Sequence, residues 1–293
     1  MREPVGLLGT GRMGSAIGRR LLAAGAPLRV WNRTPDKVVP LVAGGAVAAG
    51  SLAGLAACPV VFVMVSTSED LLAVLDGPDG LLSCPAGLRV VVDCSTVSEA
   101  ASAQARALAA AAGVGFVAAP VSGNPSVVDA GAACFVASGP REQFALAEPL
   151  LRGIGKTAVW VGDGEQSRLV KLCHNLYLGV MVQALAEVTA LAEKSGADRE
   201  AFLRFLGETV VGSEWVRRRT PALAAEDWTP TFTTTLLRKD FDLGLGAARD
   251  HEVPMALAGL THQLIQAAVG RGLGDLDLLA LYAMQAESAG LTR

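Results

Sequence analysis

The segment VKLCHNLYLGVM, residues 170–181, places three polar side chains in an otherwise largely apolar run. Lys171, His174 and Asn175 are three and four residues apart, so on a helix they share one face. An ammonium group among apolar side chains is costly unless it is paired or its pKa shifts. Each polar group therefore needs a partner or a chemical task. For a lysine, that task would be proton transfer or stabilisation of negative charge on oxygen.

A second motif, GLLGTGRMG, contains the spacing G-x-G-x-x-G at Gly9, Gly11 and Gly14. Glycine allows a tight turn and close backbone approach, and the N–H groups at a helix start attract a pyrophosphate. The motif lies near the N-terminus, directly after an apolar strand pattern and before a helical one. This context favours a dinucleotide site over a merely structural turn.

The next predicted strand ends in WNRTPDK instead of an acidic residue. An Asp or Glu there would accept hydrogen bonds from the 2′-hydroxyl of NAD. Asn32, Arg33 and Thr34 offer donors and a cation that suit a 2′-phosphate. The sequence therefore predicts NADP(H), with NADPH preferred over NADH. The alternative is that Arg33 is simply solvated in a loop.

These motifs require strands and helices that alternate along the first half of the chain. The predicted strands are Pro4–Leu8, Leu28–Trp31, Val60–Val65, Leu88–Asp93, Gly115–Val117, Ala133–Ala137 and Thr157–Val161. Helices are predicted over Gly11–Gly25 and Ala100–Ala112. Strands interleaved with helices indicate parallel βαβ units.

From Glu165 the pattern becomes helical, with one long helix to about Lys194 and an N-cap for the next at Asp198. Only helices follow, with predicted breaks near Gly212, Pro221, Thr229–Pro230, Pro254 and Gly272–Gly274. The predicted fold class is α/β: an N-terminal Rossmann dinucleotide-binding domain, a long interdomain helix and an all-α C-terminal domain. The predicted boundaries are 1–163, 164–195 and 196–293.

Composition limits the classes of partner. The 293 residues are 51% hydrophobic and 18% charged, with a net charge of −3, which provides no basic field for nucleic acid or anionic lipid. The uncharged stretch from Val38 to Ser68 resembles a membrane span, but prolines and glycines interrupt it. Five scattered cysteines without a C-x-x-C pair, and an N-terminus without a signal-peptide pattern, predict a cytoplasmic protein with reduced thiols and no metal site.

Taken together, the motifs resemble those of the β-hydroxyacid dehydrogenase family, over nearly the whole chain. This family includes 3-hydroxyisobutyrate dehydrogenase, tartronate semialdehyde reductase and the glyoxylate and succinic semialdehyde reductases. The shared motifs are the glycine loop, DCST at 93–96, APVSG at 119–123, the Lys171 and Asn175 pair, and LRKD with Lys239 and Asp240. In order along one chain, they are far more specific than the glycine motif alone.

The resemblance implies a role for each motif. Lys171 matches the catalytic lysine, and for it to act near neutral pH we expect desolvation to lower its pKa from about 10.4. The implied substrate contacts are Ser122, Gly123, Asn124 and Asn175. The implied cofactor contacts are Gly9, Thr10, Gly11, Arg12, Met13, Gly14, Asn32, Arg33, Thr34, Val65, Ser66, Ser95, Thr96 and Lys239. Ser95 and Thr96 also suit an ordinary helix cap, and Lys239 an exposed ion pair with Asp240 or Asp242.

Three residues depart from the family pattern. Asn124 replaces a second glycine, Glu99 stands where many members have proline, and His174 occupies a position that is often asparagine in the family. These departures bear on the substrate more than on the reaction. We expect reversible, NADP(H)-linked interconversion of a small anionic semialdehyde or keto acid and its hydroxy acid, by a homodimer or homotetramer. Two alternatives are an imine reductase, whose members generally lack the lysine and these motifs, and a catalytically silent NADPH-binding module. The 6-phosphogluconate dehydrogenases have a much larger helical domain.

Overall fold

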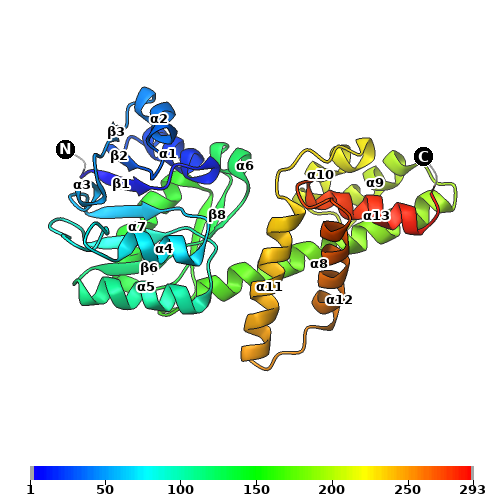
Figure 1. Cartoon of the computed structure of the whole chain (residues 1–293). Helices are drawn as coiled ribbons and strands as arrows, with labels where there is room; N and C mark the ends of the chain where they lie inside the picture. Colours follow the sequence, from blue (N-terminus) through cyan, green and yellow to red (C-terminus); the bar gives the residue numbers. More distant parts are fainter. Residues whose placement is uncertain (1–2, 292–293) are drawn as a thin grey trace. The chain divides into compact units, whose positions relative to one another are not determined.

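The computed structural model describes residues 3–291 and shows two compact units (Figure 1). Unit 1 is Met1–Lys171 and unit 2 is Leu172–Arg293. The boundary lies inside one continuous helix, α8 (Gln166–Lys194), so Lys171 is the last residue of unit 1. The sequence-based division instead treated this helix as a segment of its own.

Unit 1 is built on a parallel sheet of six strands in the order β3-β2-β1-β4-β5-β6. The strands are β1 (Val5–Leu8), β2 (Leu28–Trp31), β3 (Val47–Ala48), β4 (Val60–Val63), β5 (Val90–Asp93) and β6 (Gly115–Ala118). Leu8 pairs with Trp31 and Val63, and Val63 pairs with Asp93. The carboxyl ends of four strands therefore meet along one edge, where such sheets bind ligands.

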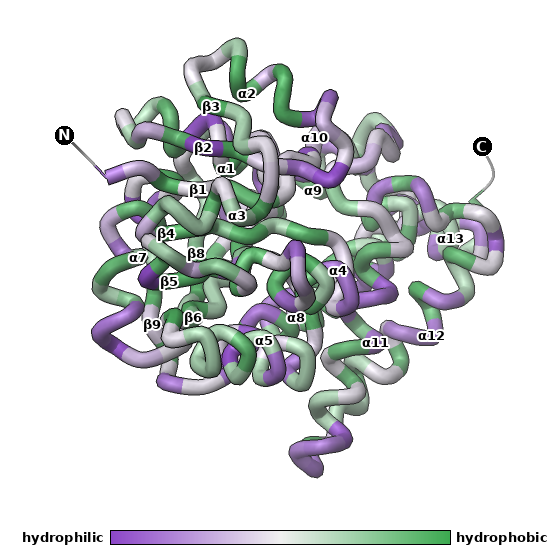
Figure 2. The backbone as a smooth tube through the Cα atoms, turned by 60° about the vertical axis from the view of Figure 1, so that its left-hand side comes forward, coloured by the Kyte–Doolittle hydropathy of each residue, from purple (hydrophilic) through white to green (hydrophobic). Residues whose placement is uncertain are grey.

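Helices cover both faces of this sheet. One apolar layer includes residues of α1 (Arg12–Ala23) and α7 (Arg141–Ile154), and the other includes residues of α3 (Leu52–Leu55), α4 (Ser68–Leu75) and α5 (Glu99–Ala111). A short helical segment, η1 (Pro35–Val38), and α2 (Val39–Ala43) follow β2. Leu7 and Val63 are fully buried because strands covered on both sides must be apolar throughout. Figure 2 shows this hydrophobic colour on β4 in the middle of unit 1.

A smaller sheet extends unit 1 beyond β6. It contains β7 (Val121–Ser122), β8 (Cys134–Ala137) and β9 (Thr157–Trp160), with β7 antiparallel and β9 parallel to β8. Helix α6 (Pro125–Asp129) lies between β7 and β8 in the chain. An isolated bridge between Ala118 and Ser138 joins this sheet to the end of β6.

Unit 2 is helical around a single apolar core. Its elements are the greater part of α8, followed by α9 (Arg199–Glu208), α10 (Glu214–Ala225), α11 (Thr234–Asp250), α12 (Ala256–Gly270), η2 (Leu278–Ala280) and α13 (Leu281–Ser288). Phe241, Leu237 and Ile265 are fully buried in this core. Asp198 caps α9 as predicted, because its Oδ1 accepts a hydrogen bond from Ala201 N at 2.7 Å.

The predicted fold class is confirmed: a Rossmann-type parallel sheet precedes a long helix and a helical second half. The predicted break at Pro221 is wrong, because this proline lies inside α10. Proline removes one helical hydrogen bond, but Val216 and Leu223 are buried on either side of it and hold the helix together. Helices α2, α3, α4, α6 and α7 and the two-residue strands β3 and β7 were not predicted.

Helix α8 has the length and composition of a membrane-crossing helix, but half of its most apolar window is buried inside the protein. It also carries the buried side chains of Arg168, Lys171 and Asn175. Long core helices of globular proteins pass the same test. All five cysteines carry free thiols.

Candidate active site

The glycine loop after β1 has three glycines with different surroundings. Gly9 has φ 90°, and a Cβ there would lie 2.1 Å from the carbonyl oxygen of Met64. A Cβ on Gly14 would lie 1.8 Å from the carbonyl oxygen of Gly9. By contrast, a Cβ on Gly11 would meet no protein atom within 4 Å. Gly9 and Gly14 therefore make the loop compact, whereas Gly11 leaves open space at the N-terminus of α1.

The features at Thr10 and Gly11 fit a bound dinucleotide. Gly11 is the N-cap of α1 and supplies no side-chain cap, which leaves the helix start able to receive an anion. The Thr10 hydroxyl is buried and has no hydrogen-bond partner among the described residues. A buried hydroxyl without a partner is costly and is commonly satisfied by a ligand or water. Arg12, the first residue of α1, is exposed, and Met13 is partly buried.

The end of β2 holds this loop in place. Asn32 Oδ1 accepts a hydrogen bond from Thr10 N at 2.9 Å, and Asn32 Nδ2 donates to the Thr34 carbonyl oxygen at 3.0 Å. The Asn32 amide is thus engaged within the protein. Arg33 is 83% exposed and pairs with Asp70 at 3.1 Å, so its guanidinium remains accessible to solvent. Thr34 is exposed.

Ser95, a predicted cofactor contact, uses its hydroxyl within the protein. Ser95 Oγ donates to Asp93 Oδ1 at 2.7 Å and accepts from Val65 N at 2.9 Å, and the residue is fully buried. It joins the loops after β4 and β5, and its predicted contact with the cofactor gains no support from these bonds. Ser66 is exposed and Thr96 partly exposed along the same edge. Helix α5 is capped by Ser98, neither by Ser95 nor by Thr96.

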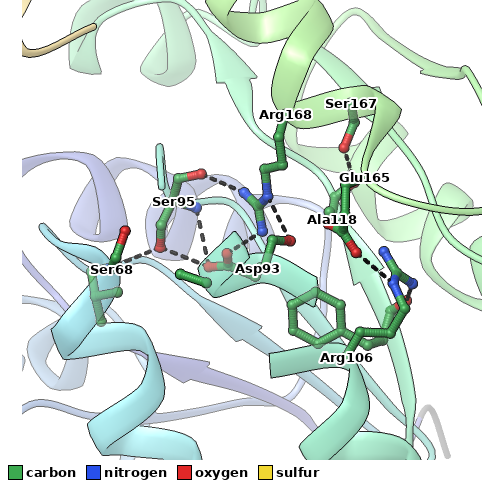
Figure 3. A network of polar contacts seen from close by, with 12 residues as sticks. Ser68, Asp93, Ser95, Arg106, Ala118, Glu165, Ser167 and Arg168 are labelled. Atoms are coloured by element: carbon green, nitrogen blue, oxygen red, sulfur yellow. Dashed lines mark hydrogen bonds and ion pairs between the residues drawn. The ribbon is translucent and has the colours of Figure 1, made fainter. Parts of the chain in front are cut away.

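A buried ion pair between Asp93 and Arg168 was missed by the sequence analysis (Figure 3). Asp93 is the last residue of β5 and is 0% exposed, whereas Arg168 lies in the first turn of α8 and is 1% exposed. An acid at the end of an apolar strand, and an arginine three residues before Lys171, were the available signals. Burial and the Asp93 carboxylate raise the pKa of the neighbouring Cys94 thiol, while Arg168 opposes this rise.

The predicted substrate motif follows β6. Ser122 ends β7, and Gly123 has φ 133°, with Val127 Cγ1 only 2.9 Å from where a Cβ would lie. Asn124 caps α6: its Oδ1 accepts from Val127 N at 3.1 Å and from the Ser126 hydroxyl at 2.7 Å. This cap is a structural reason for asparagine at a position where the family pattern has glycine.

The other two departures also have local contacts. Glu99 is the first residue of α5, where both proline and an acidic residue favour a helix start. His174 Nδ1 lies 2.8 Å from Asn175 Oδ1. His174 itself is exposed.

The predicted catalytic and orienting residues lie on α8. Lys171 is 8% exposed, at the end of unit 1. Asn175, one turn further along, is 3% exposed and donates from Nδ2 to Asp240 Oδ2 at 2.5 Å within unit 2. Lys239, partly buried, precedes Asp240 on α11. Asp242 pairs instead with His262 at 2.7 Å.

The structure thus gathers the predicted unit 1 contacts with the cofactor along one edge of the sheet, in the loops after β1, β2, β4 and β5. Asn175 and Lys239 belong to unit 2. Within residues 3–291, no three His, Cys, Asp or Glu side chains gather as a metal site would require.

Two family models together match most of the chain. Residues 4–162 match the NAD binding domain of 6-phosphogluconate dehydrogenase. Residues 165–285 match the domain described as the NAD-binding of NADP-dependent 3-hydroxyisobutyrate dehydrogenase. The first match covers the sheet of unit 1, and the second begins at the start of α8.

Curated relatives match over most of their length. The chain is 31% identical to 3-hydroxyisobutyrate dehydrogenase of Pseudomonas aeruginosa, over 89% of this chain and 90% of the relative. It is 29% identical to glyoxylate/succinic semialdehyde reductase 2 of Arabidopsis thaliana, over 94% of this chain and 78% of the relative. Among solved structures, 3-hydroxyisobutyrate dehydrogenase of Mycobacterium tuberculosis with L-serine matches with a TM-score of 0.86 and 26% identity, covering 97% and 99% of the two chains.

An imine reductase from a Pseudomonas species is a more distant neighbour. Its TM-score is 0.61 at 21% identity, covering 97% of this chain and 99% of the reductase. At that level of identity the match shows a shared fold alone.

Proposed function

The chain belongs to the β-hydroxyacid dehydrogenase family, and from this premise we propose that it interconverts a small hydroxy acid and the corresponding semialdehyde or keto acid with NADP(H). Its identity as an oxidoreductase of this family follows from the matches. The preference for NADPH, the substrate class and the roles of individual residues are our proposal.

The observation that carries the proposal is the burial of Lys171 on α8. The residue is 8% exposed, and a largely buried lysine is suited to donate a proton and to act as a base. When bound, the nicotinamide ring supplies or accepts a hydride. Lys171 would deliver a proton to the substrate oxygen during reduction and take it back during oxidation. Its positive charge would stabilise negative charge on that oxygen.

Three features support NADPH over NADH. The residue directly after β2 is Asn32 and not an acid, so a ribose 2′-hydroxyl has no carboxylate acceptor at that position. Arg33 is accessible there, and Thr34 adds an exposed hydroxyl. Guanidinium groups bind phosphate oxygens well. Asn32 would act indirectly, because its amide holds the Thr10 backbone.

The substrate would be a small molecule with an anionic group. Ser122 and the backbone at Gly123 would bind a carboxylate, as the family resemblance implies. Asn124 Oδ1 is occupied by capping α6, so only its amide nitrogen is offered to a ligand. Asn175 would orient the reacting groups while Asp240 and His174 fix its amide.

The central experiment compares wild type, Lys171→Ala, Lys171→Arg and Lys194→Ala on a panel of semialdehydes, glyoxylate and cyclic imines with NADPH and NADH. Lys194 is the matched control, because it is the last residue of the same helix and its Nζ donates to the Gly290 carbonyl oxygen at 3.0 Å. We expect Lys171→Ala to lower kcat by about 10²- to 10⁴-fold on a semialdehyde, the usual contribution of a general acid. Arginine keeps the charge but does not release its proton near neutral pH.

Each outcome has a distinct meaning. Unchanged turnover in Lys171→Ala would overturn the role of the lysine. Imine reduction without carbonyl reduction would favour the imine reductase alternative. Cofactor binding without turnover of any compound would favour a silent module. A loss in Lys171→Ala that Lys171→Arg partly restores would assign part of the effect to charge alone.

We also propose a homodimer or homotetramer assembled through unit 2. Large apolar side chains remain exposed on its helices, including Tyr177 and Leu191 at 70% and Phe205 at 67%. Side chains of this kind on one unit favour association. Light scattering after size-exclusion chromatography measures the assembly, and a monomer at micromolar concentration would contradict the proposal.

A further inference from the structure

We propose that Arg168 is a positioning residue for Lys171, because its buried guanidinium attaches the start of α8 to the loop after β5. This inference rests on the proposed function, in which Lys171 carries the proton.

Every nitrogen of the Arg168 guanidinium has a partner in unit 1. Nη2 pairs with the Asp93 carboxylate, Nη1 donates to the Ser95 carbonyl oxygen at 2.6 Å, and Nε donates to Ser102 Oγ at 3.0 Å. Asp93, Ser95 and Ser102 are all fully buried. A planar group with several fixed partners sets both the position and the rotation of the turn that bears it.

The same network continues to the cofactor loops (Figure 3). The other oxygen of Asp93 accepts hydrogen bonds from Ser95 N at 3.2 Å and Ser95 Oγ at 2.7 Å. Ser95 Oγ in turn accepts from Val65 N at 2.9 Å. Arg168 therefore lies at the junction of α8 with the loops after β4 and β5, which contain four of the predicted cofactor contacts.

Lys171 follows Arg168 by three residues on an unbroken helix. Three residues correspond to a rise of about 4.5 Å and slightly less than one turn. The backbone at Lys171 is consequently fixed by whatever fixes Arg168. A shift or rotation of this turn would move the lysine nitrogen relative to the loops that bind the cofactor, and misplacement of about 1 Å can cost 10²-fold in rate.

A role in stability alone fits the contacts less well. Buried ion pairs contribute little net stability compared with apolar replacements of similar volume. The start of α8 also has other anchors: Ser167 Oγ donates to the Ala118 carbonyl oxygen at 3.0 Å and accepts from Ser138 Oγ at 2.7 Å. Arg106 Nη2 donates to the Gly164 carbonyl oxygen at 2.8 Å. Among the contacts described for the start of α8, those of Arg168 are the ones that reach the loop after β5, whereas those of Ser167 and Arg106 do not.

The test uses a charge-free pair, Asp93→Asn with Arg168→Gln, which retains hydrogen-bonding groups and leaves no buried charge without a partner. Ser167→Ala is the matched control, since it removes a neighbouring buried anchor of the same turn and does not touch the loop after β5. For each variant, kcat, KM, cofactor Kd, thermal midpoint and the pH profile of kcat are measured. We expect the pair to lower kcat by about tenfold or more and to shift its pH profile. Ser167→Ala should lower only the thermal midpoint.

A double-mutant comparison separates positioning from general damage. If Arg168 acts through Lys171, the charge-free pair will lower turnover in the wild-type background but leave the residual single-turnover rate of Lys171→Ala unchanged. Equal fold losses in both backgrounds would overturn the inference. Kinetics and a pH profile like those of Ser167→Ala, or failure of the pair to fold, would also overturn it by assigning Arg168 to stability.

The two proposals fail in different ways. Wild-type turnover in Lys171→Ala would refute the role of the lysine and, with it, the premise of this inference. A large loss in Lys171→Ala, together with an unaltered kcat in the charge-free pair, would refute the inference alone. Arg168→Lys retains one cation without the three-way contact, so its kcat should lie between those of wild type and the pair.

Discussion

Asn175 and Asp240 are joined within unit 2 by a hydrogen bond of 2.5 Å between side chains that are 3% and 4% exposed. The bond connects α8 to α11, and the His174 ring lies 2.8 Å from the opposite end of the Asn175 amide. An amide is the right group here because it can donate to a carboxylate without adding a charge.

Asn175→Asp should make unfolding stability depend on pH. Two buried carboxyl groups would then face each other, and the pKa of one of them would rise in the folded state. The folding stability of the variant is retained below about pH 4, the pKa of an aspartate in the unfolded chain. It falls as the pH rises through the raised pKa of the folded state. Urea unfolding should show a larger loss at pH 8 than at pH 5. Asn175→Ala is the control and should show a smaller difference between the two pH values, because it adds no second carboxyl group. Equal losses in Asn175→Asp would contradict the prediction.

Gly11→Ala and Gly14→Ala should have opposite signatures. The Gly14 Cβ would lie 1.8 Å from the Gly9 carbonyl oxygen, so the loop must shift and stability should fall by about 2 kcal/mol. The Gly11 Cβ meets no protein atom, so the thermal midpoint should stay near wild type while NADP(H) affinity falls at least about tenfold. Thermal shift with and without NADP(H) measures both effects. Wild-type affinity in Gly11→Ala would place the dinucleotide elsewhere.

Arg33→Ala should weaken NADPH by about tenfold or more while changing NADH little, because a single charge-assisted contact to phosphate is worth about 1.5–3 kcal/mol. Fluorescence titration gives both dissociation constants. Asp70→Asn is an informative companion, since it removes the partner at 3.1 Å and should leave NADPH binding equal or tighter. Lys37→Ala controls for loss of an exposed cation in the same segment. Equal weakening of both cofactors in Arg33→Ala would argue against a 2′-phosphate contact.

Asn124 substitutions should separate helix capping from substrate binding. Asn124→Asp keeps an oxygen acceptor for Val127 N, so stability should change by less than about 0.5 kcal/mol. Its added negative charge should raise KM for an anionic substrate about tenfold, which Asn124→Gly should not do. Steady-state kinetics with a semialdehyde measure this contrast. A KM unchanged in Asn124→Asp would remove Asn124 from the substrate site.

Tyr282 should make unit 2 sensitive to alkaline pH. Burial and a hydrogen bond to Glu193 raise the pKa of Tyr282 to about 12. The folded protein then holds a proton that the unfolded chain releases from about pH 10, so stability is present below pH 10 and is lost as the pH rises toward 12. The loss should be about 1 kcal/mol at pH 11 and should disappear in Tyr282→Phe. Denaturant unfolding between pH 9 and 11 tests this; parallel curves for both proteins would contradict it.

Some features were predictable because their physical cause is local. The glycine loop requires its glycine spacing within a single turn of the backbone. The strand at residues 60–63 is covered on both faces of the sheet, and such a strand must be apolar throughout. Strands interleaved with helices implied a parallel sheet, and the strand order confirms that topology. The cap at Asp198 depends only on its own turn.

Other features depend on residues far apart in the sequence. Asp93 and Arg168 are 75 positions apart, so neither predicts the other without the fold. Asn32 was predicted as a cofactor contact from its place after β2, and this stays a prediction. Its hydrogen bond with the Thr10 backbone could not be predicted, because the two residues are 22 positions apart. Pro221 was predicted to break a helix because helix propensity takes no account of the burial of Val216 and Leu223. Asn124 was predicted as a substrate contact, and this stays a prediction, whereas its role as the N-cap of α6 was not predicted.

The burial of Cys94 makes its thiol a probe of local opening at the end of β5. Its thiol lies between Asp93 and Ser95, is 0% exposed and has a raised pKa, so alkylating reagents that need a thiolate should not reach it in the closed state. Cys84 and Cys173 are exposed and can be blocked first. The rate at which Cys94 is then labelled reports how often the end of β5 opens. It therefore also reports how long the contact between Asp93 at that strand end and Arg168 on α8 lasts.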